Sequence, residues 1–115
     1  MQLTDAVALV IGASAGIGHA VAARFAARGA HVLVHGRDPE RTQKVADEVR
    51  GRALVADLAS PADRQRLAAE ALDAFGHVDV LVNNAHPLAA AGDGRKGLWC
   101  DLLRDVDRRA YRRRR

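Results

Sequence analysis

The stretch VALVIGASAGIG, residues 7–18, decides the fold of this chain. Its first five residues form a continuous apolar run, which is typical of a strand buried on both faces of a parallel sheet. Glycines follow at positions 12, 16 and 18, and the alanine-rich segment 17–28 carries Ile17, Val21 and Phe25 at helical spacing before Gly29. The stretch therefore predicts a buried strand, a glycine turn and a helix.

The rest of the first 83 residues repeats this alternation of strand and helix. Further strands are predicted at residues 31–35, 53–56 and 78–83. The pairs Asp38-Pro39 and Ser60-Pro61 each combine an N-cap with a first-turn proline, and they predict helices that run to about Arg50 and to Gly76. This order predicts an α/β fold, with right-handed crossovers and helices on both faces of a parallel sheet.

Size and composition indicate one domain that is not exported. The chain has 115 residues, and with only 3% aromatic residues its core must be built from Ala, Val and Leu. The single cysteine, Cys100, cannot form an internal disulfide, and we expect it to be a small apolar contact. No secretory signal is present, and no apolar run approaches the roughly 18 residues that span a bilayer, so we expect a cytoplasmic protein without membrane contact.

The basic charge of the chain is confined to its last part. Residues 1–88 hold 9 Lys and Arg against 10 Asp and Glu, whereas residues 89–115 hold 9 against 4, so the net charges are −1 and +5. Residues 89–97 read as a loop, and apolar residues from Leu98 to Val106 predict a short helix that leads into the arginines. The predicted globular part therefore offers no basic face to a polyanion.

The glycine turn has the spacing G-x-x-x-G-x-G between a buried strand and a helix. Gly12, Gly16 and Gly18 would allow a tight turn and the close approach of a pyrophosphate to the amides at the helix N-terminus. The alternative is a turn that only connects strand to helix. A P-loop is excluded because no Lys-Ser or Lys-Thr follows the last glycine.

Three motifs in this order resemble the short-chain dehydrogenase/reductase family. IGASAGIG (residues 11–18) is similar to the family's T-G-x-x-x-G-I-G, NNAH (residues 83–86) to N-N-A-G, and Asp57 in VADL to the aspartate that contacts adenine. Two positions differ, since Ile11 replaces a threonine that braces the turn and His86 replaces a glycine.

The resemblance runs from Val7 to Ala85 and implies a Rossmann-like, doubly wound sheet with strand order 3-2-1-4. It also implies a dinucleotide cofactor. The residues expected to bind it are Gly12, Ser14, Ala15, Gly16, Ile17, Gly18, Arg37, Asp57, Leu58, Asn83, Asn84 and Ala85.

The end of the second predicted strand indicates which cofactor is used. An acidic residue at this place binds the ribose 2′-hydroxyl of NAD, whereas its absence and a nearby arginine suit the 2′-phosphate of NADP. The sequence has Gly36 and then Arg37, which favours NADP(H) over NAD(H). Alternatively, Arg37 is a solvated loop charge and Asp38 only a helix cap. His31 and His35, on the same strand, are expected to be surface or edge histidines, and no metal site is predicted.

The family's catalytic serine, tyrosine and lysine are not recognised in this chain. Tyr111 and Arg115 imitate the spacing Tyr-x-x-x-Lys, but Tyr111 follows NNA too closely, and arginine differs from lysine in shape and reach. We therefore predict no catalytic residue here and no turnover of a carbonyl or alcohol substrate. The expectation is a partial cofactor-binding domain over residues 1–86, truncated after the fourth strand, and an arginine-rich tail over residues 87–115 that comes from a frameshifted or truncated gene.

Two functions from different classes follow. The first is an oxidoreductase that transfers hydride between NAD(P) and a carbonyl or alcohol, present here as its cofactor-binding part. The alternative is a small non-catalytic protein that uses the basic tail on nucleic acid or another polyanion. Because the arginine run at residues 108–115 offers no stacking aromatic besides Tyr111, no nucleic-acid partner is expected. The unpaired edge of the fourth strand is a place where self-association could occur.

Overall fold

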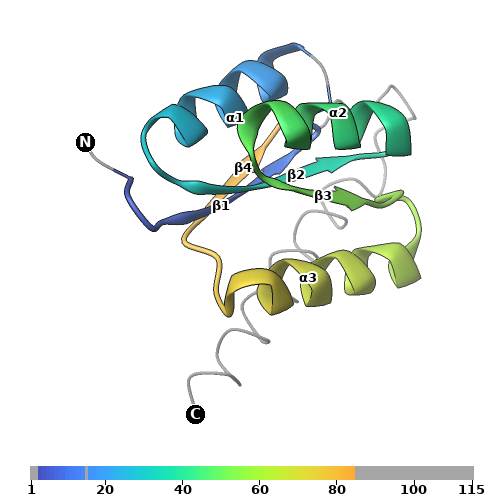
Figure 1. The fold of residues 1–115 in the computed structure, drawn as a ribbon. Coiled ribbons are helices and arrows are strands. Elements are labelled where there is room, and N and C mark those ends of the chain that lie inside the picture. The colour runs from blue at the N-terminus through green and yellow to red at the C-terminus, as the bar shows by residue number, and fades with distance from the viewer. Residues whose placement is uncertain (1–2, 15, 85–115) are drawn as a thin grey trace.

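A computed structural model describes residues 3–14 and 16–84, which form four strands and three helices in strict alternation (Figure 1). In chain order they are β1 (Val7–Ile11), α1 (Gly16–Ala27), β2 (His31–Gly36), α2 (Pro39–Val49), β3 (Arg52–Val55), α3 (Pro61–Phe75) and β4 (Val80–Asn83). Every strand and helix predicted before Asn84 is therefore confirmed, with ends that move by no more than two residues. The predicted helix after Leu98 lies outside the described residues.

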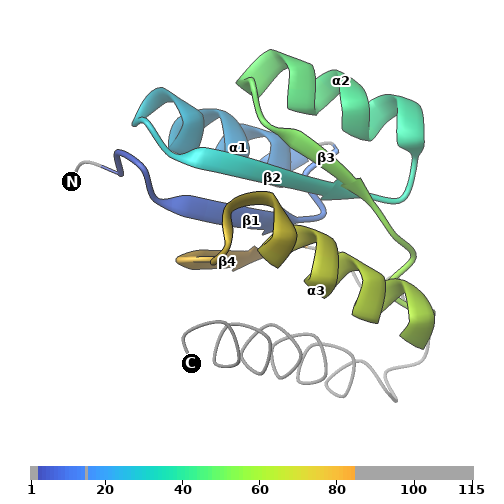
Figure 2. The ribbon, with the colours of Figure 1, turned by 60° about the horizontal axis from the view of Figure 1, so that its bottom comes forward.

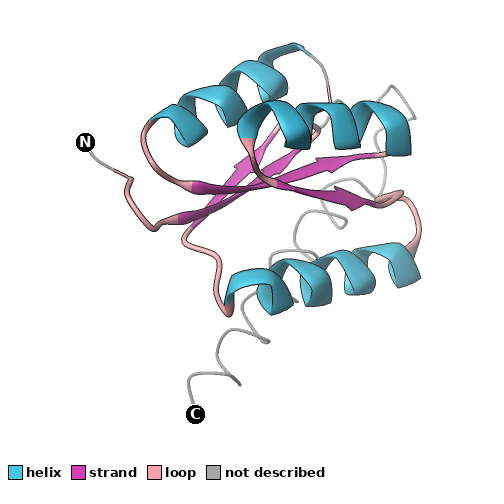
Figure 3. Cartoon of the chain, in the orientation of Figure 1, coloured by secondary structure: helices cyan, strands magenta, loops and turns pink. Residues whose placement is uncertain are grey.

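The four strands form one parallel sheet in the order β3-β2-β1-β4, which confirms the predicted order. Leu9 of β1 lies opposite Leu33 of β2 on one side and Leu81 of β4 on the other. Helices α1 and α2 cover one face and α3 covers the other, so the fold has three layers (Figures 2 and 3). This arrangement is the Rossmann-like, doubly wound type predicted from the sequence.

The two faces of β1 lie in two separate cores. Leu9 and Ile11 pack with Leu67 and Leu72 of α3, whereas Val10 packs with residues of α2, among them Val45. All five residues of β1 are buried, with at most 1% of their surface exposed. The central place of β1 in the sheet thus explains why residues 7–11 are a continuous apolar run.

Small residues let α1 approach the sheet closely. Gly18 and Ala22 are its buried positions, and Val21 and Phe25 are only partly buried against the core. Ile17, at the same spacing, is 72% exposed. The face of α1 that meets the sheet is therefore built from glycine and alanine, and the larger residues flank it.

The two predicted N-caps are present. The Asp38 carboxylate accepts hydrogen bonds from the amides of Glu40 (2.9 Å) and Arg41 (3.2 Å), and Ser60 Oγ accepts from the amide of Asp63 (3.3 Å). Asp38 is therefore a helix cap, as one of the sequence interpretations held. None of the helices among the described residues is long and apolar enough to cross a membrane.

The prediction that both histidines of β2 lie at the surface is wrong for His35. His31 is exposed and stacks on Phe75 at 4.7 Å between ring centroids, but only 2% of His35 is exposed. His35 Nδ1 accepts a hydrogen bond from the amide of Gly12 (3.1 Å), and Nε2 donates to the carbonyl of Ala56 (3.0 Å). These bonds require the neutral ring with its proton on Nε2.

Burial lowers the pKa of His35, although the hydrogen bond to Ala56 acts in the opposite direction. Above about pH 6.5 the ring is neutral in both the folded and the unfolded chain. Below that pH the unfolded chain takes up a proton that the folded chain does not. The free energy of unfolding should therefore decrease as the pH is lowered, by up to about 1.4 kcal/mol per pH unit, until the pH reaches the pKa of His35 in the folded chain.

Urea unfolding of the wild-type chain and of His35→Gln between pH 7.5 and 5 measures this effect. The stability advantage of the wild type should shrink as the pH falls, because glutamine does not titrate. Parallel curves for the two proteins would show that His35 is not held neutral by the fold.

Candidate functional site

The residues predicted to bind a cofactor meet at one edge of the sheet, where all four parallel strands end. Ile11 lies opposite Asn83, and Gly36 opposite Val55, so the four strand ends are adjacent. The glycine turn, Arg37 and Asn84 directly follow β1, β2 and β4, and Asp57 lies two residues after the end of β3. This edge, where the strand order reverses beside β1, is the usual ligand-binding place in doubly wound sheets.

Glycine is required in the turn after β1. Gly12 and Gly16 have φ angles of 74° and 62°, in the left-handed region that other residues adopt at a cost. At Gly18 a Cβ atom would collide with the carbonyl oxygen of Gly12 and lie 2.9 Å from Asn84 Nδ2. The glycines therefore fix a tight turn and a close contact between α1 and the ends of β1 and β4.

The N-terminus of α1 is electrostatically suited to an anion. The first turns of α2 and α3 contain the acids Glu40 and Asp63, but the first turn of α1 contains none. Beyond the adjacent residues and the nearby backbone of α1 itself, no described atom would lie within 4 Å of a Cβ atom on Gly16, so space is open there. The amides of a helix N-terminus, the positive end of the helix dipole and this space together fit a pyrophosphate group.

Asn84 ties the end of β4 to the turn. Its amide donates to the carbonyl of Ile11 (3.0 Å), and its side-chain Nδ2 donates to the carbonyl of Gly12 at 3.5 Å. Asn83, at the end of β4, is exposed, and so is Ile17 at the start of α1. Ala15 and Ala85 lie outside the described residues.

The segment after β3 is held by the first turn of α3. The amide of Asp57 donates to the carboxylate of Asp63 (2.8 Å), and Arg64 donates to the carbonyl of Leu58 (2.8 Å). The bond from Asp57 is the main reason why the pKa of Asp63 is lowered. One carboxylate oxygen of Asp57 accepts from the amide of Ala59 (3.0 Å), which leaves the exposed residue's second oxygen without a described partner.

The end of β2 has no space for a side chain at position 36. A Cβ on Gly36 would collide with Thr42 Oγ1 and lie 3.0 Å from Ser14 Cβ. Thr42 is fully buried, and its hydroxyl donates to the carbonyl of Asp38 (2.6 Å). Arg37 is exposed and has no hydrogen bond or ion pair with another described residue.

His35 and Thr42 are the two site residues that the sequence interpretation missed. A signal for His35 was available, because it continues the apolar run of Val32, Leu33 and Val34 in a strand that parallel pairing buries on both faces. Thr42 gave none, since its role depends on how α2 sits above β2.

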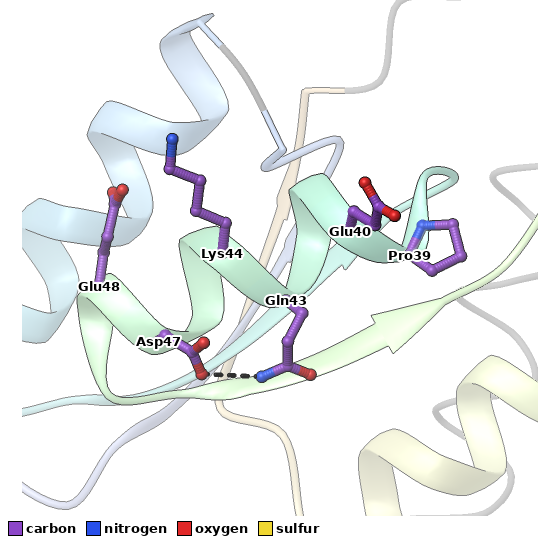
Figure 4. Close-up of a pocket in the computed structure, with 6 residues that line it drawn as sticks. All are labelled: Pro39, Glu40, Gln43, Lys44, Asp47 and Glu48. Atoms are coloured by element: carbon purple, nitrogen blue, oxygen red, sulfur yellow. Dashed lines mark hydrogen bonds between the residues drawn. The ribbon is translucent and has the colours of Figure 1, made fainter.

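A hollow lies along the exposed face of α2, and its lining has no chemistry of this kind. Figure 4 shows its lining residues, which are Pro39, Glu40, Gln43, Lys44, Asp47 and Glu48. Gln43 donates to Asp47 within this helix (2.9 Å), and none of the predicted cofactor-binding residues takes part. Residues 3–14 and 16–84 contain no group of three His, Cys, Asp or Glu side chains that could hold a metal ion.

Several predictions fall on residues that the structure does not describe. They concern His86, the apolar contact of Cys100, the rejection of Tyr111 and Arg115 as catalytic residues, and the basic tail over residues 87–115.

Comparison with known proteins identifies the family. The family model for short chain dehydrogenases matches residues 6–93. The putative ketoacyl reductase 1 of the granaticin polyketide synthase from Streptomyces violaceoruber is 40% identical in an alignment of 107 residues, which covers 84% of this chain and 38% of that protein.

Solved structures agree in fold. A hydroxysteroid dehydrogenase from Escherichia coli has a TM-score of 0.81 at 30% identity, covering 94% of this chain and 51% of that one. A 3-ketoacyl-(acyl-carrier-protein) reductase from Brucella melitensis, solved with NADH, has a TM-score of 0.74 at 33% identity, covering 93% and 49%. The chain thus spans between about a third and a half of the length of these relatives.

These matches support membership of a family of oxidoreductases and lend no support to the alternative of a small polyanion-binding protein. The turn IGASAGIG, the parallel sheet and the matched relatives point to one conclusion: this chain belongs to the short-chain dehydrogenase/reductase family, whose members bind NAD(P).

Proposed function

We propose that this chain binds NADP(H) at the carboxyl edge of its sheet and forms the cofactor-binding part of an oxidoreductase. The reaction would be hydride transfer between the nicotinamide and a carbonyl or alcohol substrate. The observation that carries the proposal is the glycine turn, which leads from β1 into the acid-free N-terminus of α1 beside Asn84.

Each predicted residue has a part in this proposal. The amides from Ser14 to Gly18 would receive the pyrophosphate, and Asp57 with Leu58 would contact the adenine. Asn83, Asn84 and Ala85, with Ile17, would line the path toward the nicotinamide ribose. The nicotinamide itself, when bound, supplies or accepts the hydride. The residues of this chain hold and orient it.

The preference for NADP(H) is supported by the end of β2. An aspartate at position 36 would need space that Thr42 and Ser14 occupy, so the chain cannot add the acid that recognises NAD without rearranging α2. Asp38 is engaged as a helix cap, whereas Arg37 is free to pair with a 2′-phosphate. The relative from Brucella melitensis was solved with NADH, so membership of the family does not itself select the cofactor.

The wider assignments are part of the same proposal. We place the protein in the cytoplasm, with a small carbonyl or alcohol as the substrate of the complete enzyme. Residues 1–86 would be a partial cofactor-binding domain and residues 87–115 a tail outside the family's pattern, of which the family model matches only residues 87–93. In the described part of the chain β4 pairs only with β1, so its other edge is a candidate for self-association.

Replacing Arg37 by alanine tests the cofactor preference. Because the guanidinium would make charged hydrogen bonds to the 2′-phosphate, Arg37→Ala should weaken NADPH binding by roughly 1–3 kcal/mol and leave NADH binding almost unchanged. Fluorescence titration with each cofactor measures this. Arg41→Ala is the matched control, because Arg41 is a nearby exposed arginine whose Nε lies 3.9 Å from Oδ2 of Asp38 and which has no predicted role toward the cofactor. Equal losses for the two cofactors, or for the two variants, would contradict the assignment.

The second test concerns turnover. Tyr111 is the only tyrosine of the chain, and Arg115 only imitates the spacing of the family's lysine, four residues after the tyrosine. The purified 115-residue chain should therefore bind NADPH without oxidising it when carbonyl substrates are added, as followed by absorbance at the NADPH band. Turnover that disappears in Tyr111→Phe would show that the tail contains an active site after all.

A further inference from the structure

One buried side chain connects the ends of three strands at the proposed cofactor site. His35, near the end of β2, accepts through Nδ1 from the amide of Gly12, which follows β1, and donates through Nε2 to the carbonyl of Ala56, which follows β3. Its backbone carbonyl also accepts from the amide of Ala13 (2.8 Å). The first two amides of the glycine turn are therefore both held by His35.

This brace stands where the chain departs from its family. Ile11 replaces the threonine whose hydroxyl would support the turn, and the Ile11 side chain, which has no polar group, is fully buried in the core beneath α3. The bond from Gly12 to the His35 ring supplies a side-chain partner to the same turn from a different strand. Within a buried site, an amide that lost such a partner would be costly to leave unpaired.

The same ring also reaches the second part of the site. Ala56 immediately precedes Asp57, and its amide donates to the carbonyl of Gly36 (3.1 Å). Because the carbonyl of Ala56 also accepts from His35 Nε2, both backbone polar groups of Ala56 are bound to β2. The His35 ring therefore forms hydrogen bonds both to the glycine turn and to the segment that carries Asp57.

We propose that His35 is a positioning residue for the dinucleotide, acting through the neutral ring with its proton on Nε2. It holds Gly12, so that the amides of the turn stay in place at the N-terminus of α1, and it holds Ala56, so that Asp57 stays in place. The inference rests on the proposed cofactor function, but the bracing of the turn can be measured without any cofactor.

Two variants separate the two bonds. In His35→Asn the side-chain oxygen can occupy the place of Nδ1 and accept from Gly12, but the side chain is too short to reach Ala56. In His35→Gln the terminal amide can occupy the place of Nε2 and donate to Ala56, but no acceptor remains at the place of Nδ1. His31→Asn is the control, because His31 is an exposed histidine at the opposite end of β2.

The first readout is hydrogen exchange of the Gly12 amide, followed by NMR in the absence of cofactor and under conditions where each variant is folded. Exchange should be about tenfold or more faster in His35→Gln, whereas it should stay close to wild type in His35→Asn and His31→Asn. The 15N shifts of the wild-type imidazole should show a protonated Nε2 and an unprotonated Nδ1. Unchanged exchange in His35→Gln, or the opposite tautomer, would overturn the bracing of the turn.

The second readout is the dissociation constant of NADPH. We expect His35→Gln to bind about tenfold more weakly than wild type, and His35→Asn to keep more of the affinity. Faster exchange with unchanged affinity would overturn the role toward the cofactor. If the wild type bound neither NADPH nor NADH, the proposed function would fail, and so would this role, whereas the exchange of Gly12 would still decide whether His35 braces the turn.

Discussion

The burial of β1 on both faces is the constraint on which the rest of the structure depends. β1 pairs with β2 and β4 and is covered by α1 and α2 on one side and α3 on the other, so five apolar residues are fully enclosed. A chain that leaves such a strand toward a helix packed on the same sheet must turn at once. Gly12 and Gly18 make this turn possible. As a result, the N-terminus of α1 lies at the edge of the sheet where β1 ends.

The three described helices differ in the charge of their first turns. In α2 the Asp38 side chain already accepts from two N-terminal amides and in α3 the Ser60 side chain accepts from one, and acids follow in the first turns of both helices. In α1 no acid is present in the first turn. Of the three described helices, α1 is therefore the one whose N-terminus remains suited to a bound phosphate. This asymmetry is why the proposed site lies between α1 and the ends of β1 and β4.

Much of the fold could be predicted because local signals agree with their tertiary setting. The run VALVI gave β1 with its observed ends, and the pairs Asp38-Pro39 and Ser60-Pro61 gave the starts of two helices, since capping and the fixed φ of proline act within a few residues. The glycine spacing gave the turn for the same reason.

What could not be predicted depends on contacts between distant residues. His35 was expected at the surface or at an edge of the sheet, but the two hydrogen bonds of its ring are made with residues 23 positions before and 21 positions after it. The collision of a side chain at position 36 with Thr42 likewise follows from the packing of α2 over β2. Ile17 follows the helical spacing of Val21 and Phe25 but lies beyond the sheet, so periodicity alone overstated its burial.

The central claim is that the carboxyl edge of this sheet binds a dinucleotide, and an NMR titration tests it most directly. The 15N-labelled 115-residue chain would be titrated with NADPH and its amide shifts followed residue by residue. Saturable shifts are expected to centre on Gly16, Gly18, Arg37 and Asn84, and the amides on the exposed face of α2 around Lys44 should not shift. Shifts confined to α2 or to the basic tail, or no saturable shift at any amide, would contradict it.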